Sequence, residues 1–170
     1  MKILLVLFLT LSLYAKGGIQ IDEILKENFS ETIMIEKKSL ILTKAEAKVI
    51  QQEAKVKLDS KIIRLYLVKE ADETIGYGVV LKKRIRTKNA AVLYMINSEK
   101  KIKAIEILSF SEPREYMPNK AWQSVFVGKG SDDMLIAGKD IPTISGATMS
   151  ADALSKAARL VLTIIKVKMP

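Results

Sequence analysis

The sequence predicts an α+β fold, in which an antiparallel β-meander packs against helices. Between residues 60 and 108, apolar side chains alternate with other residues at a period of two, which is typical of strands. Before and after this region, apolar residues recur at helical spacing instead. A chain of 170 residues is long enough for one domain with a sizeable core.

Residues 1–15 resemble a secretory signal peptide. Lys2 precedes an apolar run of about 11 residues, within the roughly 7–15 of a signal peptide and below the roughly 20 that span a bilayer. We expect cleavage after Ala15. Because Leu13 stands where a small residue is usual, an uncleaved anchor is one alternative. A buried strand is a second alternative for this apolar run. The leader predicts a location in the periplasm or on the outer face of the cytoplasmic membrane.

Residues 16–59 are predicted to form an N-terminal helical segment. Within 21–29, four apolar side chains fall on one helical face. The sequence Thr43-Lys44-Ala45-Glu46 is a capping box, in which the Thr and Glu side chains bond backbone amides at a helix start. A second helix is therefore expected to run to about Lys57.

Residues 60–170 are predicted to form the main domain. Four strands are expected, followed by an irregular region with Pro113 and Pro118 and a short helix capped by Asn119. The strands are predicted at 60–68, 75–81, 90–96 and 102–108. A last helix at 149–166 places one set of apolar residues on a single face: Ala151, Leu154, Ala158, Val161 and Ile165.

Composition excludes several kinds of chemistry. The chain has no Cys and no His, so it can form no disulfide, iron–sulfur cluster, Ser-His-Asp triad or usual zinc site. We expect no metal site, and any redox function would need an organic cofactor. The net charge of +9 suits a membrane surface, an acidic protein or a phosphate-bearing ligand. Nucleic acid is disfavoured, because the dense basic run at 82–88 lacks the accompanying recognition motifs.

The segment from Ser145 to Ser150 combines small and hydroxylated residues at the start of the last helix. A helix N-terminus presents free amides and partial positive charge, so it binds phosphate well, and Gly146 and Ala147 would let an anion approach. The alternative, favoured by spacing alone, is that Ser145 or Thr148 is an N-cap. As a cap, Thr148 would contribute about 1 kcal/mol to stability.

Ser145-Gly146-Ala147-Thr148 resembles the flavinylation motif of the FMN-binding domain family, which includes the C subunit of the sodium-translocating NADH:quinone reductase and the G subunit of the Rnf complex. The resemblance covers residues 60–165. It implies FMN attached by a phosphoester to Thr148, installed from FAD by a magnesium-dependent flavin transferase. Pro142 stands where the family commonly has an acidic residue, and Asp140 lies two residues earlier. Ser150 stands where threonine is frequent.

Further cofactor-binding residues are predicted from their chemistry. Tyr77, Tyr116 and Trp122 could cover the isoalloxazine, and the alternative for each is core packing. Lys129, and more weakly Arg114, could lie on its anionic side, and the alternative is surface charge.

The sequence offers no catalytic residue. The resemblance implies a redox carrier or an oxidoreductase subunit that works with a membrane-bound redox partner, and the lack of a catalytic residue argues against a stand-alone enzyme. The alternatives are an exported non-redox module that binds an anionic ligand and a docking subunit of a membrane complex, associated with the membrane.

Overall fold

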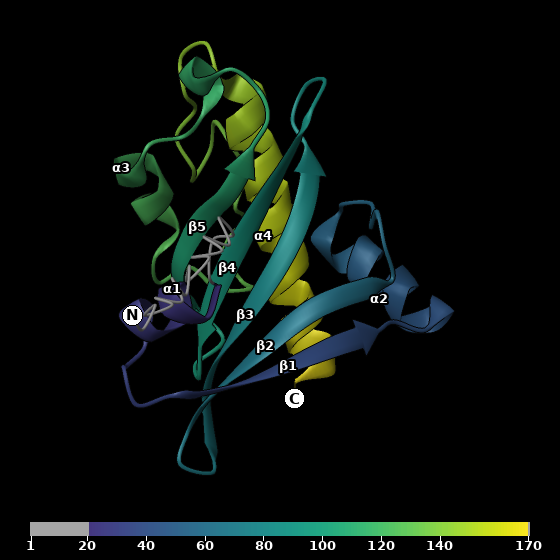
Figure 1. Cartoon of the computed structure of the whole chain (residues 1–170). Helices are drawn as coiled ribbons and strands as arrows, with labels where there is room; N and C mark the ends of the chain where they lie inside the picture. The colour runs from purple at the N-terminus through teal and green to yellow at the C-terminus, as the bar shows by residue number, and fades with distance from the viewer. Residues whose placement is uncertain (1–20, 170) are drawn as a thin grey trace, which may run out of the picture.

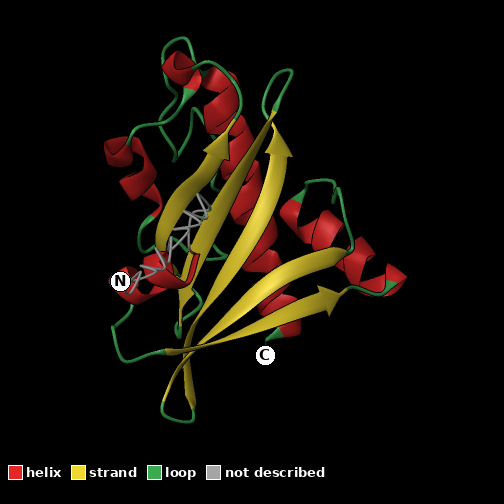
Figure 2. Cartoon of the chain, viewed as in Figure 1, coloured by secondary structure: helices red, strands yellow, loops and turns green. Residues whose placement is uncertain are grey.

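The computed structural model describes residues 21–169, so the predicted signal peptide at 1–15 lies outside the described residues. One antiparallel sheet, flanked by helices, forms the body of the molecule (Figure 1; Figure 2). The α+β fold class is confirmed. The elements in chain order are α1 (Ile21–Asn28), β1 (Met34–Ile41), α2 (Lys44–Ala54), β2 (Ile62–Glu70), β3 (Glu73–Arg84), β4 (Asn89–Asn97), β5 (Ile102–Phe110), η1 (Arg114–Tyr116), α3 (Lys120–Gln123), η2 (Ser124–Phe126) and α4 (Thr148–Lys168).

The sheet has five strands in the order β1-β2-β3-β4-β5, each antiparallel to its neighbour. The four predicted strands are confirmed, and β1 is an additional strand within the segment predicted as helical. Its sequence, Met-Ile-Glu-Lys-Lys-Ser-Leu-Ile, has no clear alternation, because β1 is an edge strand with mostly exposed side chains. Charged residues on an edge strand discourage pairing with other molecules. The prediction of a purely helical segment at 16–59 was therefore wrong for 34–41.

Helix α1 covers one face of the sheet. Leu25 packs there in a cluster with side chains of β2 and β4, including Val68 and Met95. The close approach depends on Gly76 of β3. A Cβ atom at this position would lie 2.3 Å from the Phe29 ring and 2.7 Å from the Ile96 carbonyl oxygen, so only glycine fits.

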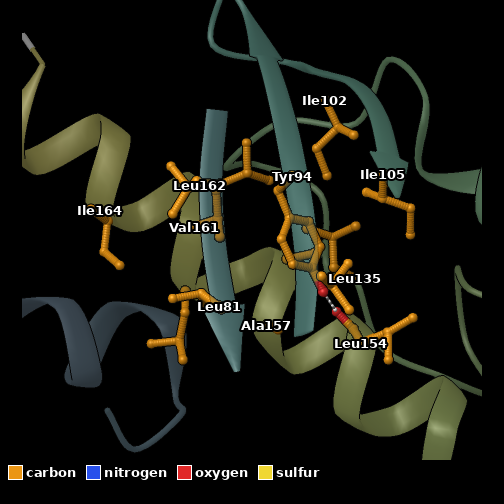
Figure 3. Packing of buried hydrophobic residues seen from close by; sticks show 14 of the residues in the cluster. Leu81, Tyr94, Ile102, Ile105, Leu135, Leu154, Ala157, Val161, Leu162 and Ile164 are labelled. Carbon is orange, nitrogen blue, oxygen red and sulfur yellow. Dashed lines mark hydrogen bonds between the residues drawn. The ribbon is translucent and has the colours of Figure 1, made fainter. Parts of the chain in front are cut away.

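Helices α2 and α4 cover the opposite face, where α4 packs against β3, β4 and α2. All five residues predicted to form the apolar face of α4 are buried. Figure 3 shows the hydrogen bond that joins α4 to the sheet, in which the buried Tyr94 hydroxyl donates to the Leu154 carbonyl at 3.0 Å. The start of α4 lies near the β3–β4 turn and the loop after β5 (Figure 1). No helix within residues 21–169 is both long and apolar enough to cross a bilayer.

The capping box of α2 is confirmed. The Glu46 amide donates to Thr43 Oγ1 at 3.2 Å, and the Thr43 amide donates to Glu46 Oε2 at 2.8 Å. The helix ends at Ala54, because Lys55 adopts a left-handed conformation with φ 51°. Glu46 also pairs with Lys168 at 2.6 Å, which ties the start of α2 to the end of α4. This pairing, together with the cap bonds from Thr43, lowers the pKa of Glu46 to about 2.

Candidate cofactor site

The hydroxyl group of Thr148, at the start of α4, does not cap the helix. Gly146 has φ 76°, a conformation that favours glycine, and Ala147 is the N-cap residue. Ala147 has no side-chain acceptor, so the alternative that Ser145 or Thr148 is the N-cap was wrong. Thr148 is instead the first helical residue, and it is exposed.

Backbone amides also converge at this helix start. The amides of Ser150 and Ala151 both donate to the Ala147 carbonyl, at 3.0 and 3.2 Å. Those of Thr148 and Met149 have no intrahelical acceptor, because the helix begins at Thr148. Together with the partial positive charge of a helix N-terminus, these two donors favour an anion beside Thr148.

Ser150 is a buried polar residue without a partner. It is only 1% exposed, and its Oγ forms no hydrogen bond to any described residue. A buried hydroxyl in this state costs about 1–3 kcal/mol. A bound group that accepts or donates a hydrogen bond here would offset that cost. The residues present therefore fit a polar ligand at the start of α4.

A hollow of about 390 Å³ opens at the same place, within the roughly 300–1,000 Å³ of ligand pockets. Its lining brings the start of α4 together with two residues from other loops, Arg86 and Tyr116. The guanidinium carbon of Arg86 lies 5.2 Å from the centre of the Tyr116 ring, in a cation–π arrangement. The remaining lining residues are Gly146, Ala147, Thr148, Met149 and Ser150.

The structure brings five of the predicted site residues together at the hollow: Tyr116, Gly146, Ala147, Thr148 and Ser150. Their contact with a cofactor stays a prediction. Arg86 was not predicted. The dense basic run at 82–88 was its only signal in the sequence, and nothing local shows which of its residues lies near Thr148.

The other predicted site residues do not line the hollow. Ser145 is exposed in the turn before it. Tyr77, in the middle of β3, packs against the larger core cluster, which corresponds to its alternative. Trp122 is 7% exposed, and its Nε1 donates to the Pro142 carbonyl at 2.7 Å. Trp122 therefore fixes the loop before the motif. Arg114 is exposed in η1.

Lys129 and Asp140 form an ion pair at 3.6 Å. The Asp140 carboxylate accepts the amides of Leu135 and Ile136, at 2.9 and 2.8 Å. Burial alone would raise the pKa of Asp140, but the amide hydrogen bonds and the Lys129 charge outweigh it, so the pKa is lowered. The Lys129 and Asp140 side chains thus stabilise the 129–140 loop.

Comparison with known proteins gives one match. The model of the family described as FMN-binding domain matches residues 88–163, from the start of β4 through most of α4. Neither the curated proteins nor the solved structures contain a match to the chain. The matched region includes Tyr116 and the whole motif at the start of α4. Residues 88–163 thus match an FMN-binding domain, and this match supports flavin binding by the chain.

Proposed function

We propose that this protein is an exported electron-transfer flavoprotein whose FMN is linked by a phosphoester to Thr148. One observation carries the proposal: an exposed, uncapped hydroxyl lies at a helix start beside free amides, a buried hydroxyl without a partner and an arginine. Each of these groups suits a phosphate, and the hollow beside them has the volume of a ligand pocket.

Different residues of the hollow would bind the phosphate and the ring system of the cofactor. The amides of Thr148 and Met149 and the guanidinium of Arg86 would neutralise the phosphate, and Ser150 Oγ would donate to the ligand. Tyr116 offers an aromatic face for the ring system. The bound flavin supplies the electron-transfer chemistry that the side chains of this chain lack.

Attachment needs only the hydroxyl of Thr148. Its Oγ would attack the phosphorus of the FMN half of FAD, the bond from that phosphorus to the bridging oxygen would break, and AMP would leave. The hydroxyl proton would pass to a base of the flavin transferase, whose Mg²⁺ would neutralise the phosphates. No electrons are exchanged in this step, so it requires no oxidant. The linkage keeps a soluble cofactor on a protein that works outside the cytoplasm.

The partners follow from the single cofactor. A protein with one flavin and no catalytic base passes electrons between other proteins, so we assign a membrane-bound reductase as donor and a protein as acceptor. The leader at 1–15 would export the chain to the periplasm or to the outer face of the cytoplasmic membrane.

Pro142 favours a second function. It replaces the acidic residue that the family commonly carries before the motif, and Asp140 is engaged with its own loop. A chain that the transferase does not recognise would be a non-redox module that binds an anionic ligand beside an unmodified Thr148.

Intact-mass analysis of the native protein separates the two functions. The proposal expects the mass of the chain plus one FMN less one water, and a fluorescent band on a denaturing gel. Thr148→Ala, made in cells that contain the transferase, should lose both signals, whereas the matched control Thr143→Ala, another exposed hydroxyl that lies outside the motif, should keep them. An unmodified native chain in a host that flavinylates other proteins would refute the proposal. The same spectrum shows whether residues 1–15 have been removed.

Stability separates attachment from folding. Because Ala147 is the N-cap, the loss of about 1 kcal/mol expected for a capping Thr148 does not apply. We expect Thr148→Ala to change the free energy of unfolding by less than about 0.5 kcal/mol, as is usual for exposed positions. A colourless but stable variant would therefore locate the linkage at this hydroxyl.

A further inference from the structure

Glu112 is a buried acid that does not line the hollow. Only 7% of its surface is exposed. Its Oε1 accepts the backbone N–H groups of Arg86, Thr87 and Lys88, at 3.1, 2.6 and 2.8 Å. The Thr87 hydroxyl donates to the same oxygen at 3.3 Å. The amides of Lys88 and Thr87 contribute most to the lowered pKa of Glu112, so the carboxylate is ionised at neutral pH.

The three amides belong to the turn between β3 and β4. A hydrogen bond from the Ile85 amide to the Lys88 carbonyl closes this turn at 3.0 Å. The Ser111 amide, next to Glu112, donates to the Asn89 carbonyl at 3.1 Å. Glu112 lies just after the end of β5, and its Oε1 accepts three successive amides. These bonds fix the position of the backbone of 86–88 relative to the end of β5.

Glu112 also precedes the loop that supplies the aromatic side of the hollow. Tyr116 lies four residues later, at the end of η1, where its amide donates to the Pro113 carbonyl at 3.0 Å. Arg86 lies over the Tyr116 ring, and both residues line the hollow beside Thr148. A single carboxylate thus joins the two loops that complete the hollow around the start of α4.

We propose that Glu112 is a positioning residue, whose carboxylate holds the 86–88 turn so that Arg86 lies over Tyr116 and faces the cofactor phosphate beside Thr148. This inference rests on the proposed attachment of FMN. Because its backbone is already fixed, Arg86 would lose less conformational entropy when it binds the phosphate. When Glu112 is removed, three backbone amides lose their acceptor and the turn loses its link to the Tyr116 loop.

The first test uses the full chain with Thr148→Ala, so that no flavin is present. Glu112→Ala should speed hydrogen exchange of the 86–88 amides about tenfold or more, since bonds to a charged acceptor are strong ones. It should also abolish the ring-current shift of the Arg86 side-chain protons over Tyr116. Glu112→Gln keeps an acceptor oxygen, so it should retain most of the exchange protection of the 86–88 amides and most of the Arg86 ring-current shift. If Glu112→Ala does not fold, Glu112→Asp, whose side chain is one methylene shorter, replaces it. An unchanged Arg86 shift would overturn the proposal.

The second test uses the flavinylated protein and reads the ³¹P resonance of its phosphoester and the flavin midpoint potential. Arg86→Gln and Glu112→Ala should shift both signals in the same direction, and the double variant should shift them no further than Arg86→Gln alone. Additive shifts, or no shift in Glu112→Ala, would overturn the proposal.

Asp140→Asn is the matched control, because Asp140 also accepts two backbone amides but does not line the hollow. It should lower thermal stability and leave the ³¹P resonance unchanged. A native chain without flavin would overturn the proposed function and the phosphate role of Arg86. The first test would then still decide whether Glu112 holds Arg86 in place.

Discussion

Removal of the Tyr94 hydroxyl tests how firmly α4 is joined to the sheet. Tyr94 is fully buried, and its hydroxyl donates to the carbonyl of Leu154, six residues after Thr148 (Figure 3). Burial raises the pKa of Tyr94, so the folded protein keeps this donor protonated. Tyr94→Phe deletes only this oxygen and leaves the ring packed as before.

The magnitude follows from three contributions. A buried intramolecular hydrogen bond contributes about 0.5–1.5 kcal/mol net. The Leu154 carbonyl lies inside α4 and keeps its helical partner, so the added cost of an orphaned acceptor is small. The deleted atom leaves little cavity volume. We therefore expect a loss of about 1 kcal/mol in the free energy of unfolding and a fall in Tm of about 2–4 °C.

Urea unfolding at neutral pH measures this loss, and Tyr77→Phe is the matched control. Tyr77 lies on the same face of the sheet but is only half-buried, and it makes no side-chain hydrogen bond to another described residue. Its change should stay within about 0.5 kcal/mol.

A pH series gives a second readout. Because the pKa of Tyr94 is raised from 10.0, its contribution is present below pH 10 and is lost as the pH rises above that value. Tyr94→Phe should remove this alkaline loss. Equal stability of Tyr94→Phe and the native protein at neutral pH would refute the structural argument.

Three further predictions concern the ends of α4 and the loop before it. The lowered pKa of Glu46 stabilises the protein above pH 4.5 and ceases to do so as the pH falls towards 2; Glu46→Gln should therefore be less stable than native at pH 7 and equal to it near pH 2 in urea unfolding. Gly146→Ala must place a Cβ at φ 76°, so calorimetry should show a loss of about 1–2 kcal/mol in the free energy of unfolding. Intact-mass analysis of this variant should show a lower flavin content, and an unchanged content would mean that modification of Thr148 does not depend on this turn. Pro142→Asp should speed flavin incorporation by a purified transferase with FAD, and an unchanged rate would exclude an acidic residue at this position as a recognition element.

Local signals in the sequence predicted the regular elements well. The capping box at Thr43 and the helical spacing in α4 depend on residues within a few positions of one another, so both were confirmed. Strand β1 was missed because an edge strand has little to bury, and its charged centre hides the period of two. Its pairing with β2 is a contact between distant segments, which the sequence of β1 alone does not reveal.

The contiguous part of the site was predictable, and of its distant residues only Tyr116 was predicted, from its aromatic side chain. The motif from Gly146 to Ser150 was found because one helix start contains all of it. Arg86 reaches the hollow through the β3–β4 turn, and Glu112 holds that turn across 24 residues of sequence. Neither role follows from residue spacing. Tyr77 was predicted to cover the isoalloxazine because it is aromatic, but the register of β3 places it against the core.

Two polar contacts fix the segments that approach the start of α4, and neither of the contributing side chains lines the hollow. Trp122 donates to the Pro142 carbonyl, and Glu112 accepts the amides of 86–88. The Trp122 contact uses a backbone carbonyl, which every residue type provides, so Pro142 is compatible with the geometry of the motif. Under the function proposed above, the effect of Pro142 would therefore be on recognition by the transferase. In the proposed attachment, loop positions fixed in this way would hold the Thr148 hydroxyl in place before any ligand binds.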